Sequence, residues 1–191
     1  EGEYGDCARP GWPPARQPPK NRKKEENMFC HQCEQAAKGK GCTYAGVCGK
    51  QPDVAALQDL LTYLLKGLAL VALEGRKVGV QDAEADRFAV SALFSTLTNV
   101  NFDPDRIVAL IRQCAETRDA LKKAVKAAGG SVDFPPGPAG LMPASGLAEL
   151  VAQGERHGLL EEGSDNEDVR SLQHILLFGI RGIAAYADHA Q

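Results

Sequence analysis

The architecture of this protein is indicated most clearly by the stretch "QPDVAALQDLLTYLLKGLALVALEG", residues 51–75. Its apolar residues recur every three or four positions, which is the period of an α-helix with one buried face. Pro52 suits the first turn of that helix, and Gly75 suits its end. The expected apolar face consists of Val54, Leu57, Leu61, Leu64, Leu65, Leu68, Val71 and Ala72.

Two further helices follow this one along the chain. The second is predicted over about residues 82–98. The third is predicted to begin after Asp103, which can cap it, with Pro104 in its first turn and Gly129–Gly130 at its end. The expected inward residues are Phe88, Leu93, Phe94 and Leu97 in the second helix and Ile107, Leu110, Ile111, Cys114, Leu121 and Val125 in the third.

The remaining sequence reads as a connection and two more helices. Residues 131–145 are rich in proline and glycine, and a short helix is expected over about residues 147–153. A last helix lies within residues 164–190, with Asp165 or Asn166 as its cap. Its apolar face consists of Val169, Leu172, Ile175, Leu176, Gly179, Ile183 and Tyr186. If an exposed helical face of this chain docks on missing domains, the chain alone should show an unusually large apolar patch.

No segment alternates between apolar and polar residues as a half-buried strand would. The predicted class is therefore all-α, with antiparallel helices packed as bundles. The chain divides into a tail, residues 1–27; a cysteine-rich loop, residues 28–50; and a helical domain, residues 51–191, that we expect to be truncated at its C-terminal end.

Four cysteines stand close together immediately before the first helix, in "MFCHQCEQAAKGKGCTYAGVCGK", residues 28–50. A C-x2-C pair can turn two sulfurs toward one metal centre, and the glycines between the cysteines let the backbone wrap closely around it. Four thiolates suit a structural zinc ion or an iron–sulfur cluster. We favour the cluster over zinc, and zinc over disulfides or free thiols. The candidate ligands are Cys30, Cys33, Cys42 and Cys48, spaced C-x2-C-x8-C-x5-C.

Other residues are weaker candidates for this site. Lys38, Lys40 and Lys50 can offset the negative charge of four thiolates. His31 lies between the first two cysteines and faces either the metal centre or solvent. Cys114 is predicted to be a buried core residue, because free cysteine commonly packs as a small apolar side chain. We expect no site role for Cys7, and structural or exposed positions for His157, His174 and His189.

The composition of the chain argues against some classes of function. The 191 residues carry a formal net charge of −3, so nothing suggests nucleic acid or a membrane surface as partner. Residues 1–27 are rich in proline and basic residues and lack the apolar core of a secretion signal, so we expect a disordered tail and a natural start at Met28. The absence of an export signal predicts a reducing cytoplasm, where clustered cysteines more often hold metal than form disulfides.

The segments at residues 28–61 and 166–190 resemble the family of hybrid cluster proteins, also called hydroxylamine reductases. The resemblance implies that Cys30, Cys33, Cys42 and Cys48 hold a [4Fe-4S] cluster. It also implies an all-α first domain of two helical bundles, followed by two α/β domains. A second cluster, of iron, sulfur and oxygen, is that family's catalytic centre, with cysteine, glutamate and histidine ligands. None of those ligands maps onto this chain, so no catalytic residue is expected in it.

Two interpretations of function follow from the resemblance and the cysteines. In the first, the chain is the amino-terminal domain of an oxidoreductase. It passes electrons from a redox donor protein to a catalytic cluster in missing C-terminal domains, which reduce hydroxylamine to ammonia, or nitric oxide. In the second, the chain is a non-enzymatic helical module that binds an iron–sulfur cluster or zinc by itself. Metal type separates these two interpretations in part, because a zinc site cannot relay electrons.

Overall fold

The computed structural model describes residues 28–158 and 166–190, and within them the predicted all-α class is confirmed. Residues 1–27, for which the sequence predicts a disordered tail, lie outside the described ranges. The described part contains no strand, only an isolated bridge between Cys30 and Cys42. Its helices are the short 3-10 helix η1 (Ala37–Gly39) and the α-helices α1 (Pro52–Lys77), α2 (Ala83–Ser95), α3 (Pro104–Ala127), α4 (Leu147–Arg156) and α5 (Glu167–His189).

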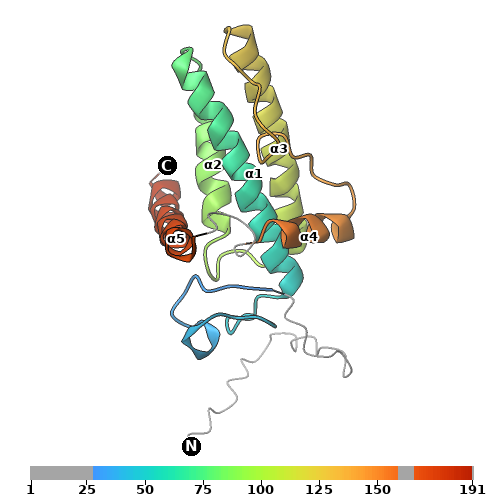
Figure 1. Ribbon diagram of the computed structural model, residues 1–191, viewed down its shortest axis with the longest axis vertical. Helices are drawn as coiled ribbons and strands as arrows, with labels where there is room; N and C mark the ends of the chain where they lie inside the picture. The colour runs from blue at the N-terminus through green and yellow to red at the C-terminus, as the bar shows by residue number, and fades with distance from the viewer. Residues whose placement is uncertain (1–27, 159–165, 191) are drawn as a thin grey trace, which may run out of the picture.

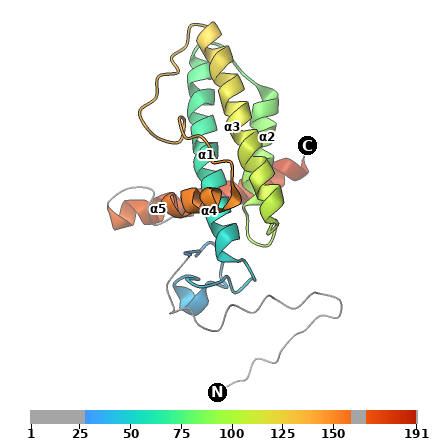
Figure 2. The same ribbon diagram turned by 90° about the vertical axis from the view of Figure 1, so that its right-hand side faces the viewer.

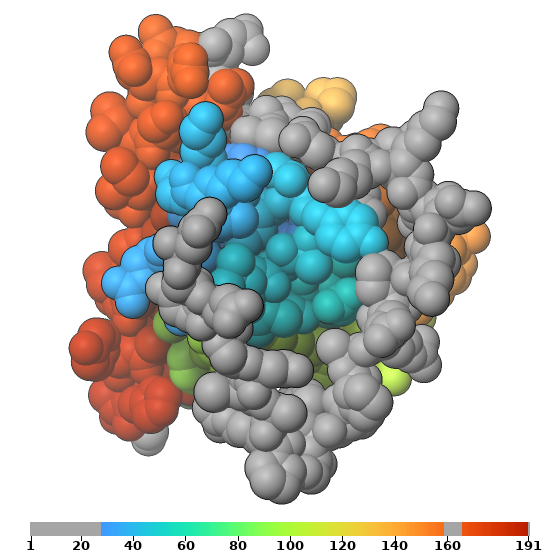
Figure 3. Space-filling view, turned by 90° about the horizontal axis from the view of Figure 1, so that it is seen from below, coloured from blue at the N-terminus to red at the C-terminus, as the bar shows by residue number. Residues whose placement is uncertain are grey.

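Three helices form an up-down-up bundle along the long axis of the molecule (Figure 1). Helices α1 and α3 make the most extensive contact, and α2 packs against both. Helices α4 and α5 run across this bundle on opposite sides, with α4 against α1 and α5 against α2 (Figures 1 and 2). Seen from below, the cysteine-rich loop lies across the end of the bundle where α1 begins, beside α5 (Figure 3).

Helix α1 is the centre of the core. The apolar face predicted for it is buried except for Ala72, which is half-buried, and Leu57, Leu61 and Leu64 are wholly inaccessible to solvent. The helix is long and apolar enough to span a membrane by length and composition, but 78% of that stretch is buried inside the protein. Its apolar character is therefore explained by the helices that surround it.

Capping side chains set where the helices begin. Asp103 was predicted to cap the third helix, and its carboxylate accepts hydrogen bonds from the backbone N–H groups at the start of α3. Asn166 performs the same role for α5. Each cap satisfies N–H groups that have no partner within the helix. At the other end of α3, Gly129 adopts the left-handed φ of 81° that lets the chain leave the helix.

The predicted end of the first helix at Gly75 is wrong, because α1 continues to Lys77. The residue with left-handed backbone is Gly79, with a φ of 76°. Gly75 is buried instead, and a Cβ there would lie 3.0 Å from the Val125 side chain of α3. This glycine therefore permits close packing of α1 against α3. Helix α2 also ends earlier than expected, at Ser95, where the Thr96 hydroxyl donates to the Leu93 carbonyl.

Hydrogen bonds from α3 hold the proline- and glycine-rich connection between α3 and α4 against the bundle. Arg118, only 1% exposed, donates hydrogen bonds to the carbonyl oxygens of Pro138 and Leu141. Lys122 donates to the Ala139 carbonyl. Backbone carbonyls that no helix satisfies thus receive donors from α3, which fixes the path of the chain toward α4.

Helix α5 packs with its apolar face turned outward. The side buried against the rest of the protein carries His174, Arg181 and Ala184. The opposite side carries the apolar face that the sequence predicted, and six of its residues form what we call the α5 stripe. These residues are Val169, Leu172, Ile175, Leu176, Ile183 and Tyr186, each between 44% and 84% exposed.

The contact between α4 and α1 depends on a glycine. A Cβ at Gly154 would collide with the Ala56 backbone, whereas a Cβ at Gly179 on α5 would meet nothing within 4 Å. We expect Gly154→Ala to lower the free energy of unfolding by about 1–3 kcal/mol, since overpacking forces the backbones apart. Gly179→Ala should raise it by up to about 1 kcal/mol through helix propensity. Urea denaturation of both variants tests this, and equal effects would contradict the packing argument.

Candidate metal centre

The cysteine-rich loop is closed on itself by a two-residue bridge. The backbone N–H of Cys30 donates to the carbonyl of Cys42 at 3.0 Å, and the N–H of Cys42 donates back at 2.8 Å. Residues that exchange both hydrogen bonds in this way lie directly opposite each other. The first and third candidate ligands are therefore brought together although they are 12 positions apart in the sequence.

Glycines allow the loop to fold tightly, as the sequence predicted. A Cβ on Gly41 would lie 2.6 Å from the ring of Phe29, and one on Gly46 would lie 3.0 Å from the sulfur of Cys48. The N–H of Gly46 donates to the Lys50 carbonyl at 2.8 Å, which closes the last turn before α1. A side chain at Gly46 would therefore crowd Cys48, and one at Gly41 would displace the Phe29 ring.

The four predicted ligands share this one loop and differ little in accessibility. Cys42 is buried, while Cys30, Cys33 and Cys48 are half-buried, and all are free thiols. Across residues 28–158 and 166–190, no three His, Cys, Asp or Glu side chains are grouped closely enough to hold a metal ion. The assignment of these cysteines as ligands therefore remains a prediction, made from their spacing and their common loop.

A buried lysine approaches the first cysteine. The Nζ atom of Lys50 lies 4.0 Å from the Cys30 sulfur and donates to the Gln58 side-chain oxygen at 2.6 Å. Lys50 is 3% exposed, whereas Lys38 and Lys40 are exposed at the surface of the loop. Of the three lysines that the sequence offered as countercharges, the structure therefore places only Lys50 in the interior.

A second buried cation reaches the loop from α5. Arg181, 2% exposed, donates to the Gln32 side chain and to the Thr62 hydroxyl of α1, each at 3.1 Å. Burial lowers the pKa of its guanidinium, while the charges of Asp59 and Cys30 act in the opposite direction. Its Nε donor is the only buried side-chain nitrogen or oxygen in the described part of the chain without a partner.

Two histidines join the loop to α5. The Nε2 atom of His31 lies 3.1 Å from the Nδ1 atom of His174, and the ring of Phe178 packs edge-on against His31. Burial, and then the neighbouring His174, lower the pKa of His31. His31 is thus half-buried rather than fully solvated, and His174 is a buried contact of the loop.

The chemistry of the four thiols and of their surroundings fits a cluster with thiolate ligands, whereas the present positions of the described side chains do not group three of them around a metal ion. The loop offers four free thiols, and two buried cations lie close to one of them. A buried positive charge is costly unless a negative charge compensates it, and thiolates supply that charge. The unpartnered Arg181 Nε also fits, because sulfur atoms of such clusters accept hydrogen bonds.

Sequence reasoning missed the partners that approach from other elements. His174 and Arg181 lie more than 140 positions from the loop residues that they contact, His31 and Gln32, and no local pattern connects them. Gln58 and Thr62 did leave a signal, because they are polar residues one turn apart on the apolar helix α1, and both are buried. Buried polar residues on a core helix indicate partners in a network.

Cys114, the last of the six cysteines, lies in the helical core and not in the cysteine-rich loop. It is wholly buried in the core between the bundle helices, as predicted. Burial raises the pKa of its thiol to about 12, although the charge of Arg118 works against that rise. A thiol that stays protonated is neither a nucleophile nor a metal ligand.

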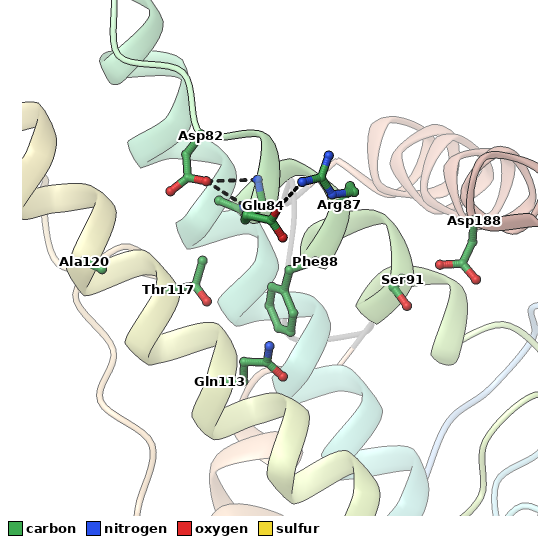
Figure 4. A pocket seen from close by; sticks show the side chains of 10 residues that line it. Asp82, Glu84, Arg87, Phe88, Ser91, Gln113, Thr117, Ala120 and Asp188 are labelled. Atoms are coloured by element: carbon green, nitrogen blue, oxygen red, sulfur yellow. Dashed lines mark hydrogen bonds and ion pairs between the residues drawn. The ribbon is translucent and has the colours of Figure 1, made fainter. Parts of the chain in front are cut away.

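An open hollow of about 540 Å³ lies between α2, α3 and the end of α5 (Figure 4). Three of its charged groups already have structural roles. Asp82 caps α2 through two backbone N–H groups, and Glu84 forms an ion pair with Arg87. We assign no site to this hollow.

Comparison with known proteins identifies the family. Residues 28–191 match the model of the Prismane/CO dehydrogenase family, so the chain belongs to that family. The matched region begins at Met28 and includes the whole cysteine-rich loop. The predicted family resemblance is thereby confirmed.

Individual relatives agree with this assignment. The chain is 62% identical over 163 residues to the hydroxylamine reductase of Syntrophobacter fumaroxidans. It is 54% identical over 164 residues to those of Methanocella arvoryzae and Solidesulfovibrio magneticus. In each case the match covers 85% of this chain, and the chain spans only about 30% of the relative's length.

Arg181 is expected to hold α5 on the loop. Arg181→Met would leave Gln32 and Thr62 without their buried donor, so we expect the free energy of unfolding to fall by about 3 kcal/mol. Arg170→Met, on the same helix, removes a side chain without a partner in the described residues and should cost under about 0.5 kcal/mol. Denaturant unfolding of both variants tests this. Similar decreases in the free energy of unfolding of the two variants would show that Arg181 does not hold α5 on the loop.

Proposed function

We propose that this chain is the amino-terminal, cluster-binding part of a longer hydroxylamine reductase. In this proposal Cys30, Cys33, Cys42 and Cys48 hold a [4Fe-4S] cluster. One observation carries the proposal: the four cysteines lie within 19 residues of one loop, inside the region that is 62% identical to a hydroxylamine reductase. The proposal includes a cytoplasmic location, because clustered cysteines that hold metal are typical of a reducing compartment.

The bound cluster would supply one-electron transfer between a donor protein and the rest of the enzyme. The residues of this chain would hold it, exclude water from it and set its electrostatic surroundings. The reaction proposed for the longer protein is the reduction of hydroxylamine to ammonia, or of nitric oxide. The groups that would carry that reaction lie outside this chain, so we assign it no catalytic residue.

The ligand assignment is tested by measuring iron and acid-labile sulfide in anaerobically purified protein. We expect about four irons and four sulfides per chain, as four-thiolate [4Fe-4S] chemistry requires. Cys30→Ser and Cys42→Ser should each lose most of the iron. Cys114→Ser should keep it, because that thiol is buried elsewhere and stays protonated.

Each outcome of this experiment has a clear meaning. Equal iron loss in all three variants would contradict the assignment of Cys30 and Cys42 as ligands. One zinc per chain without sulfide would favour the alternative of a non-enzymatic zinc-binding module. A typical iron–sulfur absorption that disappears only in the loop variants would support the proposal.

The exposed α5 stripe supports the proposal of a longer parent protein. Soluble monomers rarely expose large contiguous apolar patches unless a partner covers them. The chain spans about 30% of its relatives' length, so most of such a protein is available to cover this face. We propose that the missing C-terminal domains pack against the α5 stripe.

Leu176, 64% exposed in the α5 stripe, tests this packing. In the 191-residue chain, Leu176→Glu should change the free energy of unfolding by less than about 0.5 kcal/mol. In a parent-length protein the same change should cost about 2–3 kcal/mol, since it would bury an unpaired charge. Ser171→Glu, on the same helix but outside the stripe, should have a small effect in both proteins. Equally small effects of Leu176→Glu in the 191-residue chain and in the parent-length protein would contradict the proposal that C-terminal domains cover the α5 stripe.

A further inference from the structure

The site contains a buried lysine that no carboxylate balances. Lys50 is 3% exposed, and lysine is almost never buried to this extent without a paired charge. The contacts of its ammonium group are the Gln58 oxygen at 2.6 Å, the Cys30 sulfur at 4.0 Å and the Phe102 ring at 5.8 Å. In the described part of the chain, no Asp or Glu lies within ion-pair distance of it. The sulfur of Cys30 is therefore the nearest group that can carry a negative charge.

The position of this ammonium group is fixed by a chain of hydrogen bonds. Gln58 accepts from Lys50 and donates through its Nε2 atom to the Asn101 carbonyl at 2.8 Å. Gln58 is itself only 2% exposed, so water has little access to the hydrogen bond that it accepts from Lys50. The core helix thus holds the ammonium group beside Cys30.

We propose that Lys50 is a positioning residue of the cysteine-rich loop, whose buried charge beside Cys30 raises the reduction potential of the cluster that the loop binds. The inference rests on the proposed function, because it requires a cluster on these cysteines. One-electron reduction by a donor protein adds one negative charge close to Lys50, while no bond breaks and no proton moves. A fixed cation stabilises that added charge, so its removal lowers the potential.

Burial is what distinguishes Lys50 from the other lysines of the loop. Lys38 and Lys40 are exposed, so water and salt screen their charges. Lys50 acts through the protein interior, where the same charge has a larger effect. Lys40→Met is therefore a matched control for Lys50→Met: it removes the same charge from the same loop at an exposed position.

The test is the midpoint potential of anaerobically purified 191-residue protein, titrated alongside iron and sulfide analysis. Lys50→Met should lower the midpoint potential by at least about 59 mV. For a one-electron couple, this shift equals a tenfold change in the redox equilibrium constant. Gln58→Glu should shift it in the same direction, since it places a carboxylate against the ammonium group and cancels its field. Lys50→Arg, which keeps the charge, should restore most of the potential, and Lys40→Met should leave it unchanged.

The outcomes separate this inference from the proposed function. Wild-type protein without iron and sulfide would overturn the proposed function. Wild-type protein with a cluster, and an unchanged potential in either Lys50→Met or Gln58→Glu, would overturn only the inference. If Lys50→Met fails to fold, Gln58→Glu decides. Loss of the cluster from both variants, with normal loading of Lys40→Met, would give Lys50 a purely structural role and would also overturn the inference.

Discussion

Two positive charges are buried against a loop of thiols, and the arrangement of α1, α5 and the loop depends on them. Lys50 approaches Cys30 from the end of the loop, two residues before α1, and Arg181 reaches Gln32 from α5. Charged groups are costly to bury, so polar side chains must meet them inside an otherwise apolar core. Gln58 and Thr62 do so, which explains why the most buried helix of the protein carries two polar residues on its inner face.

The helices could be predicted from the sequence because their causes are local. The apolar period of α1 and the capping carboxylate of Asp103 both act within a few residues. Gly75 was misread for a physical reason: a glycine near the end of a helix can supply a left-handed turn or a close contact. Here Gly79 supplies the turn and Gly75 supplies the contact with Val125. Only the position of α3 distinguishes the two roles.

The candidate site could be predicted only in its local part. The spacing of Cys30 and Cys42 predicted that both lie in one short loop, and their backbones pair within it. Arg181 and His174 come from a helix that crosses the bundle, and the direction of that helix depends on packing between distant segments. A single sequence does not indicate which of its distant segments come into contact in the folded protein. Among three candidate lysines, the choice of Lys50 likewise required the burial that the folded chain provides.

Helix α5 joins the two proposals physically. An amphipathic helix normally buries its apolar face, but α5 buries His174 and Arg181 and exposes Leu176. The hydrogen bonds of Arg181 with the loop and α1 account for this orientation, since a buried guanidinium must keep its acceptors. The apolar face then remains for another surface to cover. A domain that covered this face would contact the same helix that holds the loop. Helix α5 would then link the assembly of the longer protein to the surroundings of Cys30.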